Sequence, residues 1–225
     1  MLSKENRQSA RIMGRVLNDP LYDGNCSRTA RERLEAGDVD GAIAEWRRLA
    51  DLGSGRARCI LAYIALRGTA SAAPDLEEAR RLASSAVGVE RGYANYVLAW
   101  IAIKEGQASI VARYLAESYK AGFTPAATEL ALIMLNPRAS AKMQSEAESL
   151  LRKSAAAGHR PAKMLLCGAY LRGQWGFAKR FLGAALLPMA FIQMYWSFKY
   201  RVFSLGSFDY RPSAQPLFAN QETSD

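Results

Sequence analysis

Histidine and cysteine are scarce in this chain, and their scarcity removes several classes of function. The 225 residues include one histidine, His159, and three cysteines, Cys26, Cys59 and Cys167. The cysteines form no Cys-x-x-Cys pair and are odd in number, which argues against a disulfide framework and suits a reducing compartment. A metal site or a histidine-based dyad needs partners that these residues do not supply. We therefore place His159 in a turn after Gly158, and expect no metal, no cofactor and no small-molecule substrate.

The motifs of phosphate and nucleotide chemistry are also missing. The chain contains no P-loop and no Gly-x-Gly-x-x-Gly sequence. Its paired carboxylates, such as Glu77 with Glu78 and Glu146 with Glu148, fall at expected helix starts. Negative charge there interacts favourably with the helix dipole. We therefore expect no enzymatic activity. Two carboxylates converging in a pocket would instead support an enzymatic function.

The N-terminal residues lack the long apolar stretch of a secretory signal peptide. We expect a cytoplasmic location, either free or attached to the inner face of a membrane. By composition and turn signals we divide the chain into a polar N-terminal arm (1–26, with a short helix near 9–17), a repeat region (27–175), an apolar segment (176–203) and a flexible tail (204–225).

Acidic residues are outnumbered, which leaves a net charge of +9. The excess lies mostly in residues 42–173, with 18 basic and 11 acidic side chains. Such a field favours acidic proteins, anionic lipid or nucleic acid and discriminates poorly among them. Arg47, Arg48, Arg80 and Arg81 lie on successive helices, either as a solvated face or as a basic ridge. Few aromatic residues are interleaved with them, so RNA binding is the weaker alternative.

What the chain has in abundance is an internal repeat. Each copy carries an alanine followed four residues later by a leucine: Ala57 and Leu61, Ala94 and Leu98, Ala126 and Leu130, Ala162 and Leu166. The alanines are 37, 32 and 36 residues apart, a period typical of α-solenoids. Apolar residues at helical spacing follow each alanine and predict a helix with one apolar face, which Glu129 interrupts in the third copy.

A second helix precedes each of these helices, after a first helix expected over 27–36. It carries a column of mostly small residues and a column that is larger in three of its four members: Ala42, Ala79, Val111 and Ala147, then Trp46, Ala83, Leu115 and Leu151. Small residues let helix backbones approach closely, and large ones fill the space between helices. Glycines mark the turns and helix ends, namely Gly53, Gly122 and Gly158, then Gly68, Gly106 and Gly173, whereas the third copy stops at Asn136-Pro137.

Three stretches resemble the Sel-one-like repeat, a relative of the tetratricopeptide repeat. They are Ala-Glu-Trp-Arg-Arg-Leu-Ala-Asp-Leu-Gly (44–53), Ala-Ala-Ala-Gly-His-Arg-Pro-Ala (155–162) and Met-Leu-Leu-Cys-Gly-Ala-Tyr-Leu-Arg-Gly (164–173). The resemblance covers about residues 30–187 and is weakest in the third copy. The family consists mainly of adaptors and scaffolds, and occurs in bacterial envelope and polysaccharide systems. The resemblance implies protein binding and supplies no catalytic residues.

We therefore expect an all-α fold, a right-handed α-solenoid of antiparallel helix pairs with about four to five repeats and an apolar C-terminal helix. Its concave surface would hold a peptide or protein partner. The candidate binding residues, all expected to be exposed, are Tyr63, Arg67, Tyr93, Trp100 and Lys104.

Charge is absent from residues 181–198, and this segment has three competing interpretations. Its candidate contact residues are Phe181, Leu182, Leu186, Leu187, Phe191, Ile192, Tyr195, Trp196 and Phe198. First, Ala178 can take the small column of a last repeat helix over 176–187, which Pro188 then breaks or kinks, as a cap or a protein-docking helix. Second, 18 uncharged residues meet the lower bound for a membrane span. Third, aromatic residues mixed with basic ones suit a helix lying in the membrane surface.

These patterns together predict a non-catalytic scaffold or adaptor that binds a protein or peptide and associates with a membrane through residues 176–203. One alternative is a soluble adaptor whose C-terminal helix docks on a partner protein. The weaker alternative is a basic RNA-binding solenoid, whose binding would depend steeply on salt.

Overall fold

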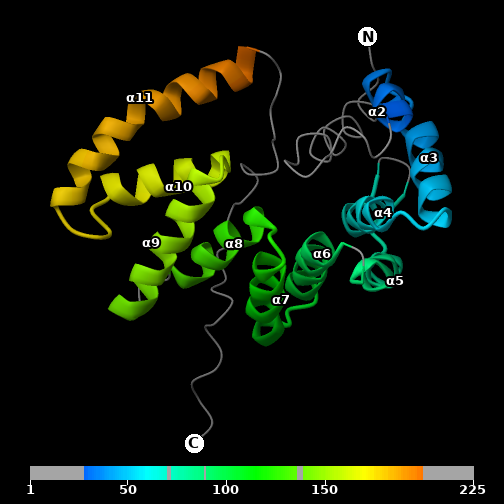
Figure 1. Ribbon diagram of the computed structural model, residues 1–225, viewed down its shortest axis with the longest axis horizontal. Helices are drawn as coiled ribbons and strands as arrows, with labels where there is room; N and C mark the ends of the chain where they lie inside the picture. The colour runs from blue at the N-terminus through cyan, green and yellow to red at the C-terminus, as the bar shows by residue number, and fades with distance from the viewer. Residues whose placement is uncertain (1–27, 70–71, 89, 136–138, 200–225) are drawn as a thin grey trace, which may run out of the picture. The chain divides into compact units, whose positions relative to one another are not determined.

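The computed structural model describes residues 28–69, 72–88, 90–135 and 139–199. These residues form helices and no strand (Figure 1), so the predicted all-α class is confirmed. The helices are α2 (Arg28–Glu35), α3 (Val39–Asp51), α4 (Gly55–Arg67), α5 (Leu76–Ala86), α6 (Arg91–Lys104), α7 (Ala108–Lys120), α8 (Thr124–Met134), α9 (Ala141–Ala156), α10 (Arg160–Leu171) and α11 (Ala178–Lys199). The predicted N-terminal arm, the C-terminal tail and the Asn136-Pro137 stop lie outside the described residues.

The chain divides into two compact units, and the boundary falls within α7, after Tyr114. In the first unit each helix from α2 to α6 packs on the next, and α4 also contacts α6. In the second unit α8 packs on α9, α9 on α10 and α10 on α11. Adjacent helices are therefore paired within each unit, and in the first unit alternate helices also meet.

Side-chain caps and glycine turns define the helix ends. Asp38, Ser54, Asp75 and Ser140 each accept a hydrogen bond from a backbone N–H in the first turn of the following helix. Such caps satisfy donors that a helix start leaves unpaired. The chain turns from one helix to the next at glycines with positive φ, 94° at Gly53 and 90° at Gly122 and Gly158. The predicted glycine turns are confirmed, because other residues adopt this backbone conformation at a cost.

The predicted repeat columns form the core of both units. The reference alanines are fully buried: Ala57, Ala94, Ala126 and Ala162. The leucines four residues after them are buried as well. Both columns of the preceding helices are buried too, with Trp46 and Leu151 among the largest fully buried side chains. The helical register predicted from the repeat is therefore confirmed in every copy.

Three predictions, one about Glu148 and two about α11, are wrong. Helix α9 begins at Ala141, so Glu148 lies in its middle, where it is buried, rather than at a helix start. Helix α11 continues through Pro188 to Lys199, so of the two effects predicted for the proline the break in the helix is wrong. Within α11 the small residue that meets the protein is Gly183, whereas Ala178 is exposed, which places the assumed fifth-repeat register in error.

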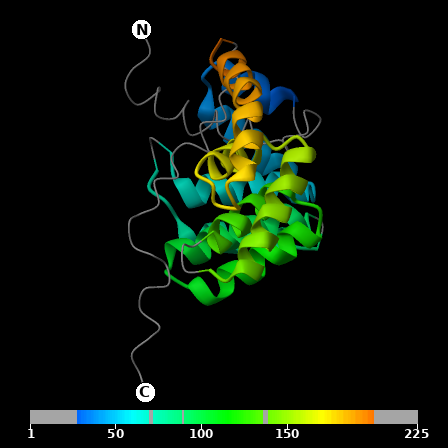
Figure 2. The same ribbon diagram turned by 90° about the vertical axis from the view of Figure 1, so that its left-hand side faces the viewer.

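The long helix α11, drawn in yellow to orange, is visible from two directions in Figures 1 and 2. It runs beside α10 in the opposite direction (Figure 1). Among the helices that the structure describes, none has the combination of length and apolar character that crossing a membrane requires.

Candidate functional site

Aromatic and basic side chains gather where α4 and α6 pack together in the first unit. The guanidinium carbon of Arg67 lies 5.4 Å from the ring centroid of Tyr63 and 5.4 Å from that of Trp100. Tyr63 and Arg67 are four residues apart and so share one face of α4. Because Trp100 comes from α6, the guanidinium joins two helices that are not consecutive. We call Tyr63, Arg67, Tyr96, Trp100 and Lys104 the α4/α6 cluster.

The sequence identified most of this cluster but erred at two tyrosines. Tyr63, Arg67 and Trp100 are partly exposed and Lys104 is exposed, as predicted. Tyr93 is only 5% exposed and belongs to the core, so its predicted surface position is wrong. Tyr96, which the sequence analysis missed, packs edge-on against Trp100 with ring centroids 6.3 Å apart. The four-residue spacing of Tyr96 and Trp100 on one helix was the available signal.

Positive charge in the cluster is not cancelled by carboxylates. In the part of the chain that the structure describes, neither Arg67 nor Lys104 pairs with an acidic side chain. They end α4 and α6, where a helix carries partial negative charge. A guanidinium stacked on rings still presents N–H donors at its edge, in the geometry that binds a carboxylate through two bonds.

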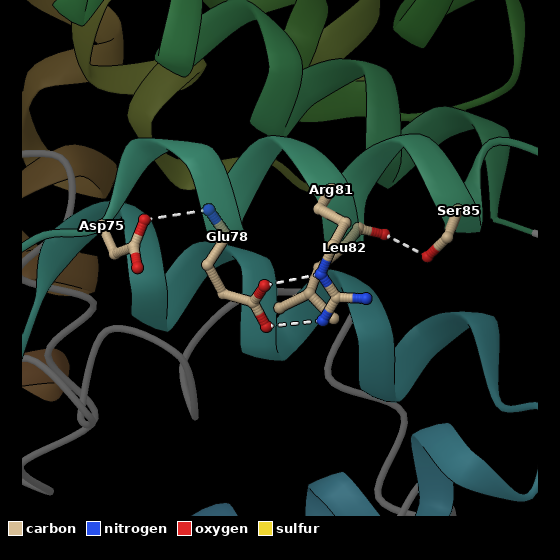
Figure 3. Close-up of polar contacts among 5 residues, drawn as sticks. All are labelled: Asp75, Glu78, Arg81, Leu82 and Ser85. Carbon is tan, nitrogen blue, oxygen red and sulfur yellow. Dashed lines mark hydrogen bonds and ion pairs between the residues drawn. The ribbon is translucent and has the colours of Figure 1, made fainter.

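The predicted arginine ridge differs from the cluster because its charges are largely paired. Three of its four arginines bind glutamates: Arg48 to Glu45, Arg81 to Glu78 and Arg80 to Glu105. Figure 3 shows the two parallel bonds from Arg81 to Glu78. This hydrogen bonding holds the pKa of the Glu78 carboxyl below its usual value. A ridge of free positive charge is therefore wrong for these three residues.

His159 occupies a turn between helices, as predicted, and its ring is tied into a buried hydroxyl chain. Its Nδ1 lies 2.8 Å from the hydroxyl of Thr128, which lies 2.9 Å from that of Ser154. Ser154 in turn donates to the carbonyl of Thr124 at 3.3 Å. Every hydroxyl is satisfied if the histidine donates from Nδ1 and each hydroxyl donates onward. Burial lowers the pKa of His159 to about 4, so the ring is neutral near pH 7.

A second buried network attaches α11 to the helices before it. The Glu148 carboxylate of α9 accepts hydrogen bonds from the Tyr170 hydroxyl at 2.8 Å and the Lys179 ammonium at 2.5 Å. Burial and the bond to Glu148 raise the pKa of Tyr170 to about 12. Trp175 donates from Nε1 to the Gln144 carbonyl at 2.9 Å, which fixes the loop before α11. These hydrogen bonds attach α11 and the loop before it to the preceding helices.

Neither network has the set of side chains that a metal centre requires. Within the described residues, no three histidine, cysteine or acidic side chains come together as metal ligands require. The hydroxyls of Thr128 and Ser154 are buried. Cys59 and Cys167 are buried, and Cys26 lies outside the described residues.

The predicted contact residues of the C-terminal segment divide into two groups. Phe181, Leu182, Leu187 and Ile192 are exposed and Leu186 is partly buried. The remaining candidates have side chains that lie outside the described part: Phe191, Tyr195, Trp196 and Phe198. Exposed apolar residues of this helix therefore begin at its first turn.

Comparison with known proteins gives no match: no protein-family model, no curated protein and no solved structure matches this chain.

Proposed function

We propose that this chain is a non-catalytic helical-repeat adaptor that binds an acidic peptide segment of a partner protein on the α4/α6 cluster. The single observation that carries the proposal is Arg67, whose guanidinium lies over the rings of both Tyr63 and Trp100 and has no carboxylate partner among the described residues. Tyrosine, tryptophan and arginine are the residue types that contribute most to protein interfaces. The cluster combines all three on two packed helices.

The finer architecture that we propose is a right-handed α-solenoid of Sel-one-like repeats. Its support is the buried repeat columns, the glycine turns between helix pairs, and the contact of α4 with α6. In such folds alternate helices line one continuous surface, which suits the recognition of an extended chain. Tyr63 and Trp100 are 37 residues apart, as are Arg67 and Lys104, so two copies present the same pair of side-chain types.

An acidic ligand follows from the charges of the cluster. Arg67 can hold a carboxylate with two parallel hydrogen bonds, and Lys104 adds a second positive charge. The rings of Tyr63 and Trp100 shield the Arg67 guanidinium from water on the side that faces them, which strengthens its electrostatic attraction for an anion. The paired arginines of α3 and α5 offer no comparable site.

The test is a selection of peptides from a random display library by the full chain. We expect the selected peptides to be enriched in aspartate and glutamate. Arg67→Ala and Trp100→Ala should each weaken their binding by about 2 kcal/mol, or about thirtyfold in Kd. Arg81→Ala is the matched control, because it removes an arginine that is exposed and paired with Glu78.

Three outcomes would contradict the proposal. The chain could select no peptide, it could select peptides without acidic enrichment, or the control could weaken binding as much as Arg67→Ala does. Fluorescence anisotropy of one labelled selected peptide, measured at two salt concentrations, provides the affinities. Loss of affinity at high salt is expected to be modest, because few charges are involved.

A further inference from the structure

An exposed apolar stripe runs along α11 in the second unit. Its members recur at intervals of four, four, three and four residues: Phe177, Phe181, Ala185, Pro188 and Ile192. All five are exposed, and Phe181 and Ile192 are 69% and 57% exposed. This spacing places the four members within α11 on one side of the helix, and Phe177, one residue before it, packs edge-on against Phe181 with ring centroids 5.8 Å apart. The stripe therefore presents a continuous apolar surface with no covering element among the described residues.

The opposite side of α11 fixes the direction in which the stripe faces. Gly183 is buried against α10, where a Cβ atom would lie 2.8 Å from the Leu171 nitrogen. The Cys167 thiol donates to the Gly183 carbonyl at 3.4 Å, and Lys179 binds Glu148. Since these contacts lie on the side away from Phe181, the stripe stays outward while the unit is folded.

The charge beside the stripe is positive. Residues 178–199 contain Lys179, Arg180 and Lys199 and no acidic residue, and Lys179 lies on the opposite side of α11, bound to Glu148. The exposed Arg180 has its guanidinium 5.5 Å from the ring centroid of Phe177, so a charge borders the start of the stripe. An occupant of this surface must therefore accept apolar side chains and bring negative charge.

We propose that the stripe binds the surface of an anionic phospholipid bilayer, with α11 lying in the plane of the membrane. The phenyl and aliphatic groups would enter the headgroup–acyl boundary, while the flexible stem of Arg180 lets its charge reach lipid phosphates. A second copy of the chain is the poorer occupant, because pairing two such stripes would bring together helices that are both positively charged. This inference does not depend on the peptide-binding proposal, since the α4/α6 cluster belongs to the first unit.

The experiment is co-sedimentation of the full chain with vesicles of phosphatidylcholine alone or mixed with phosphatidylglycerol. We expect binding to the mixed vesicles only. The double variant Phe177→Ser/Phe181→Ser should weaken it by about tenfold or more. Arg180→Gln should weaken it by about fivefold, the contribution of one basic residue near an anionic surface.

The matched control is Leu52→Ser/Met143→Ser, which removes two exposed apolar side chains from elsewhere in the chain. The control should bind the mixed vesicles like the unmodified chain. The four substituted side chains are all exposed, so the helices should remain. Circular dichroism of both double variants checks this.

Several results would overturn the inference. They are no sedimentation with either vesicle, equal sedimentation with both, or equal losses in the test and control variants. A concentration-dependent dimer that Phe177→Ser/Phe181→Ser abolishes, with no vesicle binding, would assign the stripe to a second copy instead. Binding of a selected acidic peptide, measured on the same variants, should be unchanged, so failure here is distinguishable from failure of the proposed function.

Discussion

At the scale of single residues, side chains of one type differ in role because their surroundings differ. Arg67 is stacked on two rings without a carboxylate, whereas Arg81 is paired within its own helix. An exposed ion pair such as Arg81 with Glu78 contributes little to stability, because solvent screens the attraction. Glu148 is buried and holds two donors, so it acts as an anchor. The chemical environment of a residue therefore decides its role.

His159 makes the stability of the second unit depend on pH. Its pKa of about 4 in the folded chain lies below the ordinary value of 6.5, so the unfolded chain binds the proton more readily. The resulting stability is complete above pH 6.5 and is lost as the pH falls toward about 4. We expect this contribution to be about 1–3 kcal/mol. Urea denaturation at a series of pH values measures it.

The variant His159→Asn isolates this effect from the titration of carboxylates. Asparagine is a favourable residue at a helix start and has an amide that can bond to Thr128. Its stability should therefore fall less between pH 6.5 and 4 than that of the unmodified chain. Parallel pH profiles for the two proteins would refute the assignment.

At the scale of helices, Gly183 sets the approach of α11 to α10. Gly183→Ala should destabilise their contact by about 1–3 kcal/mol, because the added methyl group would meet Leu171 and Tyr170. This outweighs the gain of about 1 kcal/mol from alanine in a helix. Chemical denaturation and proteolysis within α11 report the change. Gly88→Ala is the control, since an added Cβ there meets nothing within 4 Å, and equal stability of the two variants would contradict the account.

The same helix shows where the sequence was insufficient. Between Ala42 and Cys167, apolar residues recur at helical spacing among polar ones and so identify the buried side of each helix. The predicted columns are indeed buried. Residues 181–198 carry no charge, so their pattern does not distinguish one side from another. From the sequence we therefore assigned Ala178 as the contact residue. In the structure the contact residue is Gly183, where the backbones of α10 and α11 pack closely.

The α4/α6 cluster was predictable in part for a similar reason. The repeat places Tyr63 and Trp100 at equivalent positions, so both could be assigned to a shared surface. The burial of Tyr93 depends on how the neighbouring helices pack, which one helix pattern does not specify. The pairing of Glu148 with Tyr170 and Lys179 likewise depends on how three successive helices, α9, α10 and α11, pack together.

At the scale of the whole molecule, the two compact units should respond separately to local damage. In repeat proteins stability is close to a sum of local terms and nearest-neighbour contacts. Ala162→Asp places a charge in the core of the second unit, where Ala162 is fully buried. We expect native-state hydrogen exchange to accelerate in α9 and α10 while α4 and α6 stay protected. Uniform loss of protection in both units would show a single cooperative molecule.

The most direct test of the central claim locates a bound peptide on the chain. A selected acidic peptide carrying a diazirine group would be cross-linked to the full protein, and the modified residues identified by mass spectrometry. We predict cross-links in the last turns of α4 and α6, near Arg67 and Lys104. Cross-links confined to α11, or to the paired arginines of α3 and α5, would contradict the assignment of the α4/α6 cluster as the binding surface.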